Sequence, residues 1–171
     1  MATTIVVVFW SRTGTTERLA MTAAVGAVQQ RALIRLRWLR EEASSEAVAA
    51  DPEWEENRHR MLQEYIPPRE VDIQGADGLV LLTPSHIAAD APEWRAFFDL
   101  LTRAGTGKKV SVFGDTLEAP ATSAGCAVVP CATPSSDPTT RALELGRSVA
   151  RACIVGQDDI LRPIVNRPAR T

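Results

Sequence analysis

Residues 5–20, with the sequence IVVVFWSRTGTTERLA, decide the fold of this chain. A β-branched, apolar run ends at Ser11, and a hydroxyl-rich turn over 11–16 leads directly into an alanine-rich segment. This pattern predicts a buried strand, a tight turn and a helix, in that order. The first N–H groups of a helix have no intrahelical acceptor, and the helix dipole favours a negative charge beside them. We therefore expect the turn to bind an anion.

The chemistry of the turn favours a single phosphate monoester. It offers hydroxyls, one cation and a glycine that lets the backbone approach closely: Ser11, Arg12, Thr13, Gly14, Thr15 and Thr16. It lacks the lysine of a G-x-x-x-x-G-K-[ST] loop and the glycine spacing of a G-x-G-x-x-G dinucleotide site. The alternative is an ordinary helix cap with spare hydroxyls. The position after the first strand disfavours that alternative, because open α/β sheets bind ligands at the carboxyl ends of their strands.

Composition is that of one globular domain. The chain has 171 residues, 45% of them hydrophobic and 23% charged, and a net charge of −2. We expect a domain over 1–155 and a tail over 156–171 that lies along the domain or a partner subunit. The charge balance argues against nucleic acid, and the scattered histidines and cysteines argue against a metal site. We also expect a cytoplasmic protein with reduced thiols and no membrane span.

Strand and helix patterns alternate along the chain, which predicts an α/β fold with a parallel sheet covered on both faces. The first strand is apolar throughout and the second alternates with arginines, so we place the first inside the sheet and the second at an edge. This gives a five-stranded sheet of order 2-1-3-4-5. The strands are expected at 4–10, 33–39, 78–83, 109–113 and 127–131, with helices at 15–30, 52–65, from about 90 past 101, and 138–153.

The connection between the fourth and fifth strands is unusually short. Only residues 116–125 are available, and they include Pro120. A parallel crossover needs at least about 10–12 residues. We therefore expect a shortened fourth crossover, formed by coil or a single helical turn.

Two further loops should meet the phosphate turn at the same edge of the sheet. The third strand is followed by Thr83, Pro84, Ser85, His86 and Ile87, and the fourth by Gly114 and Asp115. Small residues there leave room for a flat ring against main-chain amides. His86 can donate a hydrogen bond to a ring oxygen or to a developing negative charge. The alternatives are a solvated loop histidine and an ordinary turn at 114–116.

Three segments in this order, SRTGTTERLA, ADGLVLLTPSHIAADAPEWRAFFD and GKKVSVFGD, resemble the flavodoxin-like superfamily. The closer resemblance is to its FMN-dependent NAD(P)H:quinone oxidoreductases of the tryptophan-repressor-binding-protein type, and it covers about residues 5–115. The resemblance implies a flavodoxin-like three-layer sandwich. It implies FMN phosphate at the turn 11–16 and ring contacts at 83–87, Gly114 and Asp115. In this interpretation no side chain is an obligatory acid or base, and His86 is the candidate catalytic residue as a helper to the cofactor. NADH or NADPH would be the electron donor, a quinone or similar small molecule the acceptor, and the assembly a homodimer or homotetramer.

Two other functions remain open. A flavodoxin-type electron carrier is disfavoured by the charge of −2 and by the absence of Tyr or Trp from the 83–90 loop. A flavodoxin-fold accessory protein without redox activity is favoured by the shortened crossover and the unusual tail. Uptake of FMN separates this last possibility from the other two.

Overall fold

A five-stranded parallel sheet of order β2-β1-β3-β4-β5 forms the centre of the molecule in the computed structural model. The structure describes residues 2–165, with side chains to residue 155. The strands are β1 (Thr4–Phe9), β2 (Leu33–Trp38), β3 (Gly78–Leu82), β4 (Lys109–Phe113) and β5 (Ala127–Val128). All four pairings are parallel. The predicted strand order, with β1 inside the sheet and β2 at its edge, is confirmed.

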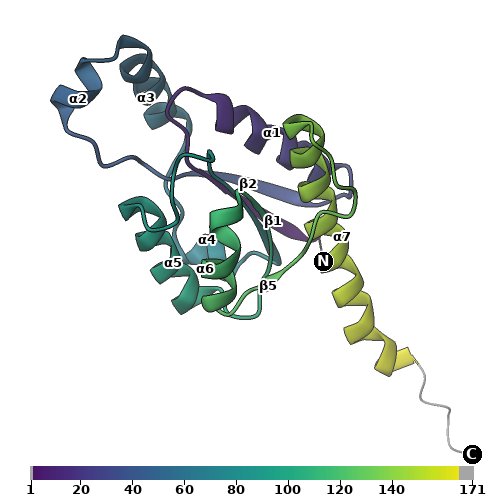
Figure 1. Ribbon diagram of the computed structural model, residues 1–171. Coiled ribbons are helices and arrows are strands. Elements are labelled where there is room, and N and C mark those ends of the chain that lie inside the picture. The colour runs from purple at the N-terminus through teal and green to yellow at the C-terminus, as the bar shows by residue number, and fades with distance from the viewer. Residues whose placement is uncertain (1, 166–171) are drawn as a thin grey trace, which may run out of the picture.

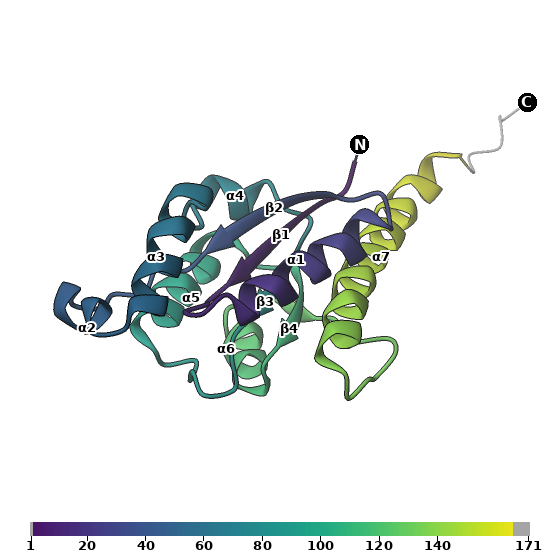
Figure 2. The ribbon, with the colours of Figure 1, turned by 90° about the horizontal axis from the view of Figure 1, so that it is seen from above.

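Helices cover both faces of this sheet, so the molecule has three layers (Figure 1). One face carries α1 (Thr15–Val28) and α7 (Pro138–Val165), and the other carries α4 (Glu70–Gln74), α5 (Pro92–Ala104) and α6 (Glu118–Ser123). Between β2 and α4 the chain makes an excursion that holds α2 (Ser45–Ala49) and α3 (Pro52–Glu64). Figure 2 shows this excursion beyond the carboxyl end of the sheet, with α3 near the start of α1.

The apolar core is divided by the sheet into two clusters. Ile5, Val7 and Phe9 face α1 and α7, whereas Val6 and Val8 face α5 and α6. This is why β1 has no polar alternation: both of its faces are buried.

Helices α1 and α7 approach each other closely because each has a glycine at the contact. A Cβ atom at Gly26 would lie 2.1 Å from the carbonyl oxygen of Leu143, and one at Gly146 would lie 1.9 Å from that of Ala23. The close packing fixes the start of α7 beside the start of α1, at the edge of the sheet where β1, β3 and β4 end.

The fourth crossover is short, as predicted. A single 3-10 turn, η1 (Asp115–Leu117), leads into the six residues of α6. Strand β5 has two residues, whereas the sequence predicted a strand over 127–131. The last ladder bond runs from the Val129 N–H to the Val110 carbonyl at 2.7 Å, and Pro130 follows it at the open edge of the sheet, where a missing N–H is tolerated.

Several helix boundaries differ from the sequence prediction. Helix α7 continues through Gly156 and Pro163 to Val165, whereas the prediction ended it near 153. The remainder of the predicted tail, 166–171, lies outside the described residues. Helices α2 and α4 were not predicted, because five residues are too few to show a helical period. In the described part of the chain, no helix is both long and apolar enough to cross a bilayer.

Candidate functional site

The turn between β1 and α1 is held open by one internal hydrogen bond. Ser11 is buried, and its hydroxyl oxygen accepts the Gly14 N–H at 3.1 Å. The hydroxyl hydrogen of Ser11 is therefore left to donate to a ligand. Gly14 has φ +88°, a conformation in which a side chain is strained, although a Cβ there would meet no atom closer than 3.5 Å. The glycine is required by the backbone angle and not by lack of space.

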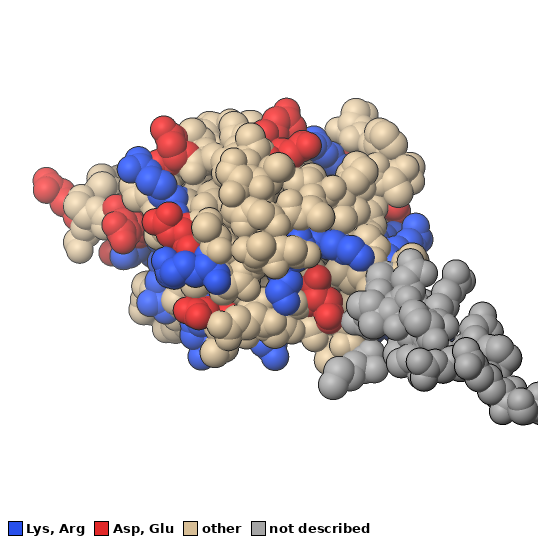
Figure 3. Space-filling model, turned by 90° about the horizontal axis from the view of Figure 1, so that it is seen from below, with Lys and Arg blue, Asp and Glu red and all other residues tan. Residues whose placement is uncertain are grey.

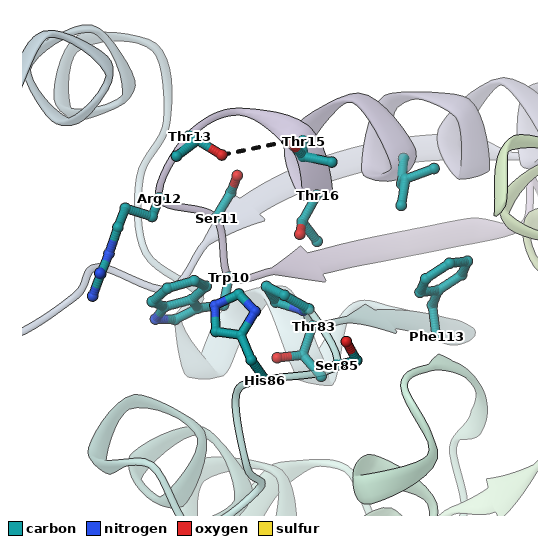
Figure 4. A pocket seen from close by; sticks show the side chains of 12 residues that line it. Trp10, Ser11, Arg12, Thr13, Thr15, Thr16, Thr83, Ser85, His86 and Phe113 are labelled. Carbon is teal, nitrogen blue, oxygen red and sulfur yellow. Dashed lines mark hydrogen bonds between the residues drawn. The ribbon is translucent and has the colours of Figure 1, made fainter. Parts of the chain in front are cut away.

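The other hydroxyls of the turn gather at the start of α1 (Figure 4). The Thr13 and Thr15 hydroxyl oxygens lie 3.5 Å apart, and Thr16 is buried beside them. Together with the first N–H groups of α1, they form a concentrated set of neutral donors. Such a set suits a phosphate group at a helix N-terminus.

Arg12 points away from these hydroxyls (Figure 4). Its guanidinium binds the Glu41 carboxylate, with Nη2 2.5 Å from Oε1 and Nε 3.4 Å from Oε2. The same group lies over the Trp54 ring, 4.0 Å from its centroid, and 5.7 Å from the centroid of Trp10. Arg12 thus links the turn to the α2–α3 excursion.

A cavity of about 360 Å³ opens beside the turn. This volume is at the lower end of the range of small-molecule sites. The loop that follows β3 forms one wall and the end of β4 another, so the predicted meeting of three strand ends is observed. The lining residues are Trp10, Ser11, Arg12, Thr13, Thr15, Thr16, Leu19, Thr83, Pro84, Ser85, His86 and Phe113.

Thr83 and Gly114 lock the ends of β3 and β4 together. The Thr83 hydroxyl oxygen accepts the indole N–H of Trp94 at 3.0 Å, and the Thr83 N–H donates to the Phe113 carbonyl at 3.0 Å. A Cβ atom at Gly114 would lie only 2.7 Å from Cγ2 of Thr83, and φ of Gly114 is +123°. Both the close approach and the backbone angle therefore call for glycine at 114.

The loop after β3 exposes His86 to solvent at the mouth of the cavity. Its ring meets the edge of Trp10, with centroids 6.2 Å apart and planes at 84°. Ile87 packs instead against the apolar cluster on the α5 side. Gly114 and Asp115 border a smaller adjoining cavity. The structure thus brings the 11–16 turn together with residues 83–86, while Ile87 lies outside the main cavity.

Three lining residues were not predicted: Trp10, Leu19 and Phe113. Trp10 and Phe113 stand where β1 and β4 end, so the position of an aromatic residue at a strand terminus was an available signal. Leu19 lies one turn into α1 from Thr15 and Thr16 and faces the same side of the helix.

The first turn of α1 also contains a buried carboxylate, which α3 neutralises. Glu17 accepts two hydrogen bonds from Arg60, at 2.9 and 2.5 Å, and one from the Tyr65 hydroxyl at 2.7 Å. The Arg60 guanidinium lowers the pKa of Glu17. Burial, followed by the bond to Glu17, raises the pKa of the Tyr65 phenol. The Glu17 carboxylate is therefore bound by Arg60 and Tyr65, on the side of α1 that faces α3.

Surface charge shows no extended basic field on the face seen in Figure 3. Lys and Arg are interspersed with Asp and Glu there, and acidic side chains lie at the protruding α2 end. Within the part of the chain that the structure describes, no group of three or more His, Cys, Asp or Glu side chains is placed to hold a metal ion.

Comparison with known proteins identifies the fold. No protein-family model matches the chain, and no curated protein sequence does either. A flavodoxin from the domain Archaea has 12% identity and a TM-score of 0.63, over 88% of this chain and 99% of that one. Two-electron reduced flavodoxin from Megasphaera elsdenii has 20% identity and a TM-score of 0.56, over 86% and 98%. A flavone reductase has 16% identity and a TM-score of 0.54, over 90% and 64%. The fold is therefore flavodoxin-like.

Proposed function

We propose that this protein binds FMN and passes electrons from NADH or NADPH to a quinone or similar flat small molecule. The observation that carries the proposal is the cavity itself. There, a hydroxyl-rich turn at the start of α1 meets the loops after β3 and β4, at the edge where open α/β sheets bind ligands. The neighbours in solved structures, among them flavodoxins and a flavone reductase, support the same choice of cofactor class.

The donor set fits the phosphate of FMN. Ser11, Thr13, Thr15 and Thr16 would hold it with their hydroxyls and with the N–H groups at the start of α1. The paired Arg12 is not needed for this, because the hydroxyl and backbone donors already face one space. A dinucleotide pyrophosphate fits less well, since the turn has a single glycine.

The ring would lie between the loop of residues 83–86 and the end of β4. Trp10 and Phe113 supply apolar walls, and Thr83 supplies a buried hydroxyl whose oxygen is fixed by Trp94. His86, exposed at the mouth, can donate a hydrogen bond to an acceptor oxygen or supply a proton to it. When bound, FMN would supply the exchange of hydride and electrons, which these side chains position and shield.

The direct test is purification followed by FMN titration and steady-state oxidation of NADH and NADPH with benzoquinone. We expect a yellow protein, submicromolar FMN affinity and turnover with one of the two nucleotides. Thr16→Val should weaken FMN binding. Thr22→Val should not, because the Thr22 hydroxyl donates to the Arg18 carbonyl within α1. If FMN is fully bound but no turnover is found, the proposed enzyme activity is wrong. If the protein takes up no FMN, it is an accessory protein.

A flavodoxin-type electron carrier is the second candidate. Residues 41–56 contain seven Asp and Glu and no Lys or Arg, so the modest net charge hides an acidic segment. Glu41, at its start, contacts Arg12 of the turn. Acidic surfaces of this kind steer encounters with basic partner proteins. If the FMN-loaded protein accepts electrons from a reductase protein but never directly from NADH or NADPH, the carrier is the correct assignment.

We also propose a homodimer or homotetramer, by analogy with the quinone oxidoreductases that the sequence resembles. Size-exclusion chromatography with light scattering measures the assembly directly, and a monomer at micromolar concentration would contradict it.

A further inference from the structure

Two more cavities follow one another from the candidate FMN cavity past the end of β4. The nearer one, of about 210 Å³, shares Thr83, Ser85 and Phe113 with it and extends to Asp115 and Arg141. The farther one, of about 360 Å³, is also bordered by those last two residues. We call these two cavities together the β4-end pocket. The walls of its farther part are Val112, Glu118, Val128, Val129, Pro130, Cys131 and Leu145.

The β4-end pocket exists because the fifth strand and the fourth crossover are both short. Strand β5 stops at Val128, whereas β4 continues to Phe113. The chain leaves the sheet at Pro130, and α6 has only six residues, so the end of β4 is not covered by a strand or a long helix. The apolar side chains of β4, β5 and α7 then line the space that is left.

Arg141, from the first turns of α7, stands where the two parts of the pocket meet. Its guanidinium carbon lies 5.1 Å from the centroid of the Phe113 ring. Its only ion-pair partner among the described residues is Asp115, at 3.6 Å between Nη2 and Oδ1, which is too long for a hydrogen bond. The Asp115 side chain is 97% exposed, so water screens this pair and weakens it.

Arg141, which lies beside Phe113, differs in this respect from Arg12, which lies beside Trp10. Arg12 gives two hydrogen bonds to Glu41, whereas no hydrogen bond from the Arg141 guanidinium occurs among the described residues. A guanidinium that lies beside an aromatic ring and makes no side-chain hydrogen bond has its N–H groups available for bidentate contact with a carboxylate or sulfonate. The pocket therefore combines apolar walls with one available cation.

We propose that the β4-end pocket receives the electron acceptor and that Arg141 selects acceptors bearing one acidic substituent. The inference rests on the proposed function, since the acceptor must lie beside the FMN site. The acidic group would replace the exposed Asp115 carboxylate on Arg141, while the flat apolar body lies along Phe113 and the strand ends. Glu118, which also lines the pocket, disfavours a second negative charge deeper inside.

Kinetics with two matched quinones tests the selection. With FMN saturating, KM is measured for 1,4-naphthoquinone-2-sulfonate and for neutral menadione. Arg141→Gln should raise KM for the sulfonate about tenfold or more, the usual size of a charge-assisted hydrogen-bonded contact, and leave KM for menadione within about twofold. For Arg141→Lys, KM for the sulfonate should lie between the values for the wild type and for Arg141→Gln. Arg151→Gln, an arginine of α7 that bonds Gln30, is the matched control.

Asp115→Asn supplies the opposite prediction. Removing the competing carboxylate should lower the ratio of sulfonate KM to menadione KM, the reverse of the Arg141 variant. Equal changes for both quinones, or no change in the ratio for either variant, would overturn the inference.

Equilibrium binding separates this inference from the proposed function. Anthraquinone-2-sulfonate, which offers no free quinone ring position for addition of the Cys131 thiol, is titrated calorimetrically into the protein supplied with FMN but without nucleotide. Neutral 2-(hydroxymethyl)anthraquinone is the comparison. Loss of sulfonate affinity in Arg141→Gln but not Arg151→Gln supports the pocket even if no turnover is found. Equal sulfonate affinity in all three proteins overturns it even if the protein is a quinone reductase.

Discussion

The guanidinium carbon of Arg12 lies 4.0 Å from the centroid of Trp54, which joins the 11–16 turn to the α2–α3 excursion. Glu41 holds the same guanidinium from the chain that leads into α2. Trp54 is 7% exposed, so the contact is largely shielded from water. Arg12 therefore acts as a link between two segments that are distant in sequence, and we expect the phosphate of the proposed FMN to be bound by the neutral donors of the turn.

Arg12→Gln tests this role. We expect the free energy of unfolding to fall by about 1 kcal/mol, because a cation–π contact and a half-exposed ion pair are lost. FMN affinity should change by less than about threefold, since Arg12 does not face the hydroxyls. Urea unfolding and FMN titration measure the two effects separately. A tenfold loss of FMN affinity with unchanged stability would instead make Arg12 a phosphate ligand, as the sequence resemblance implied.

The contrast between Arg12 and its neighbours shows which features of the site could be predicted from the sequence. The turn, the strand order and the meeting of three loops follow from local patterns: β-branched runs, hydroxyls before a helix, and strand ends that share one edge. The direction of the Arg12 side chain depends on Glu41 and Trp54, which no local pattern connects to it. The end of α7 was missed because Gly156 and Pro163 favour an earlier end on local grounds, whereas the helix continues to Val165.

Gly114→Ala should disturb the site through Thr83. The new Cβ would lie 2.7 Å from Cγ2 of Thr83, and φ of +123° is unfavourable for alanine. We expect a loss of about 1–3 kcal/mol in the free energy of unfolding and weaker FMN binding, because the ends of β3 and β4 must separate. Thermal and urea unfolding, with FMN titration, measure both.

Gly107→Ala is the matched control for this substitution. Gly107 also has positive φ, +81°, but a Cβ there would meet no atom within 4 Å. Gly107→Ala should lower the free energy of unfolding by about 1 kcal/mol, from the backbone angle alone, and leave FMN binding unchanged. The double variant Thr83→Ser, Gly114→Ala removes the clashing methyl and should recover part of the loss. No recovery would mean that backbone strain, and not the Thr83 contact, determines the effect.

Trp94→Phe should remove the hydrogen bond to the Thr83 hydroxyl while keeping an aromatic side chain in the core. The variant keeps an aromatic ring but removes the N–H that donates to Thr83 at 3.0 Å. We expect a loss of about 1 kcal/mol in stability and a shift in the absorbance spectrum of bound FMN, because the Thr83 hydroxyl can then rotate. In a double-mutant cycle with Thr83→Val, the two effects should be clearly non-additive. Additive effects would show that Trp94 acts by packing alone.

Asp72 makes the free energy of unfolding fall as the pH becomes acidic. Its carboxylate is buried and accepts two hydrogen bonds from Arg37, at 2.8 and 2.6 Å, with Arg69 close by. These contacts, Arg37 above all, hold the pKa of Asp72 far below its usual range. A carboxyl group whose pKa is lower in the folded state stabilises the protein above its unfolded pKa of about 4. That contribution is lost as the pH falls from there toward the folded pKa.

Asp72→Asn should therefore be destabilised most at neutral pH, by about 3 kcal/mol or more, because Arg37 loses its charged partner. The difference in unfolding free energy between the wild type and the variant should shrink steadily below about pH 4, where the wild-type carboxylate takes up its proton on unfolding. Asp99→Asn, a substitution at an exposed residue of α5, is the matched control and should change the free energy of unfolding little. Urea unfolding at a series of pH values between 7 and the acid transition measures all three proteins. A difference for Asp72→Asn that stays constant with pH would show that the carboxylate is not linked to folding through Arg37.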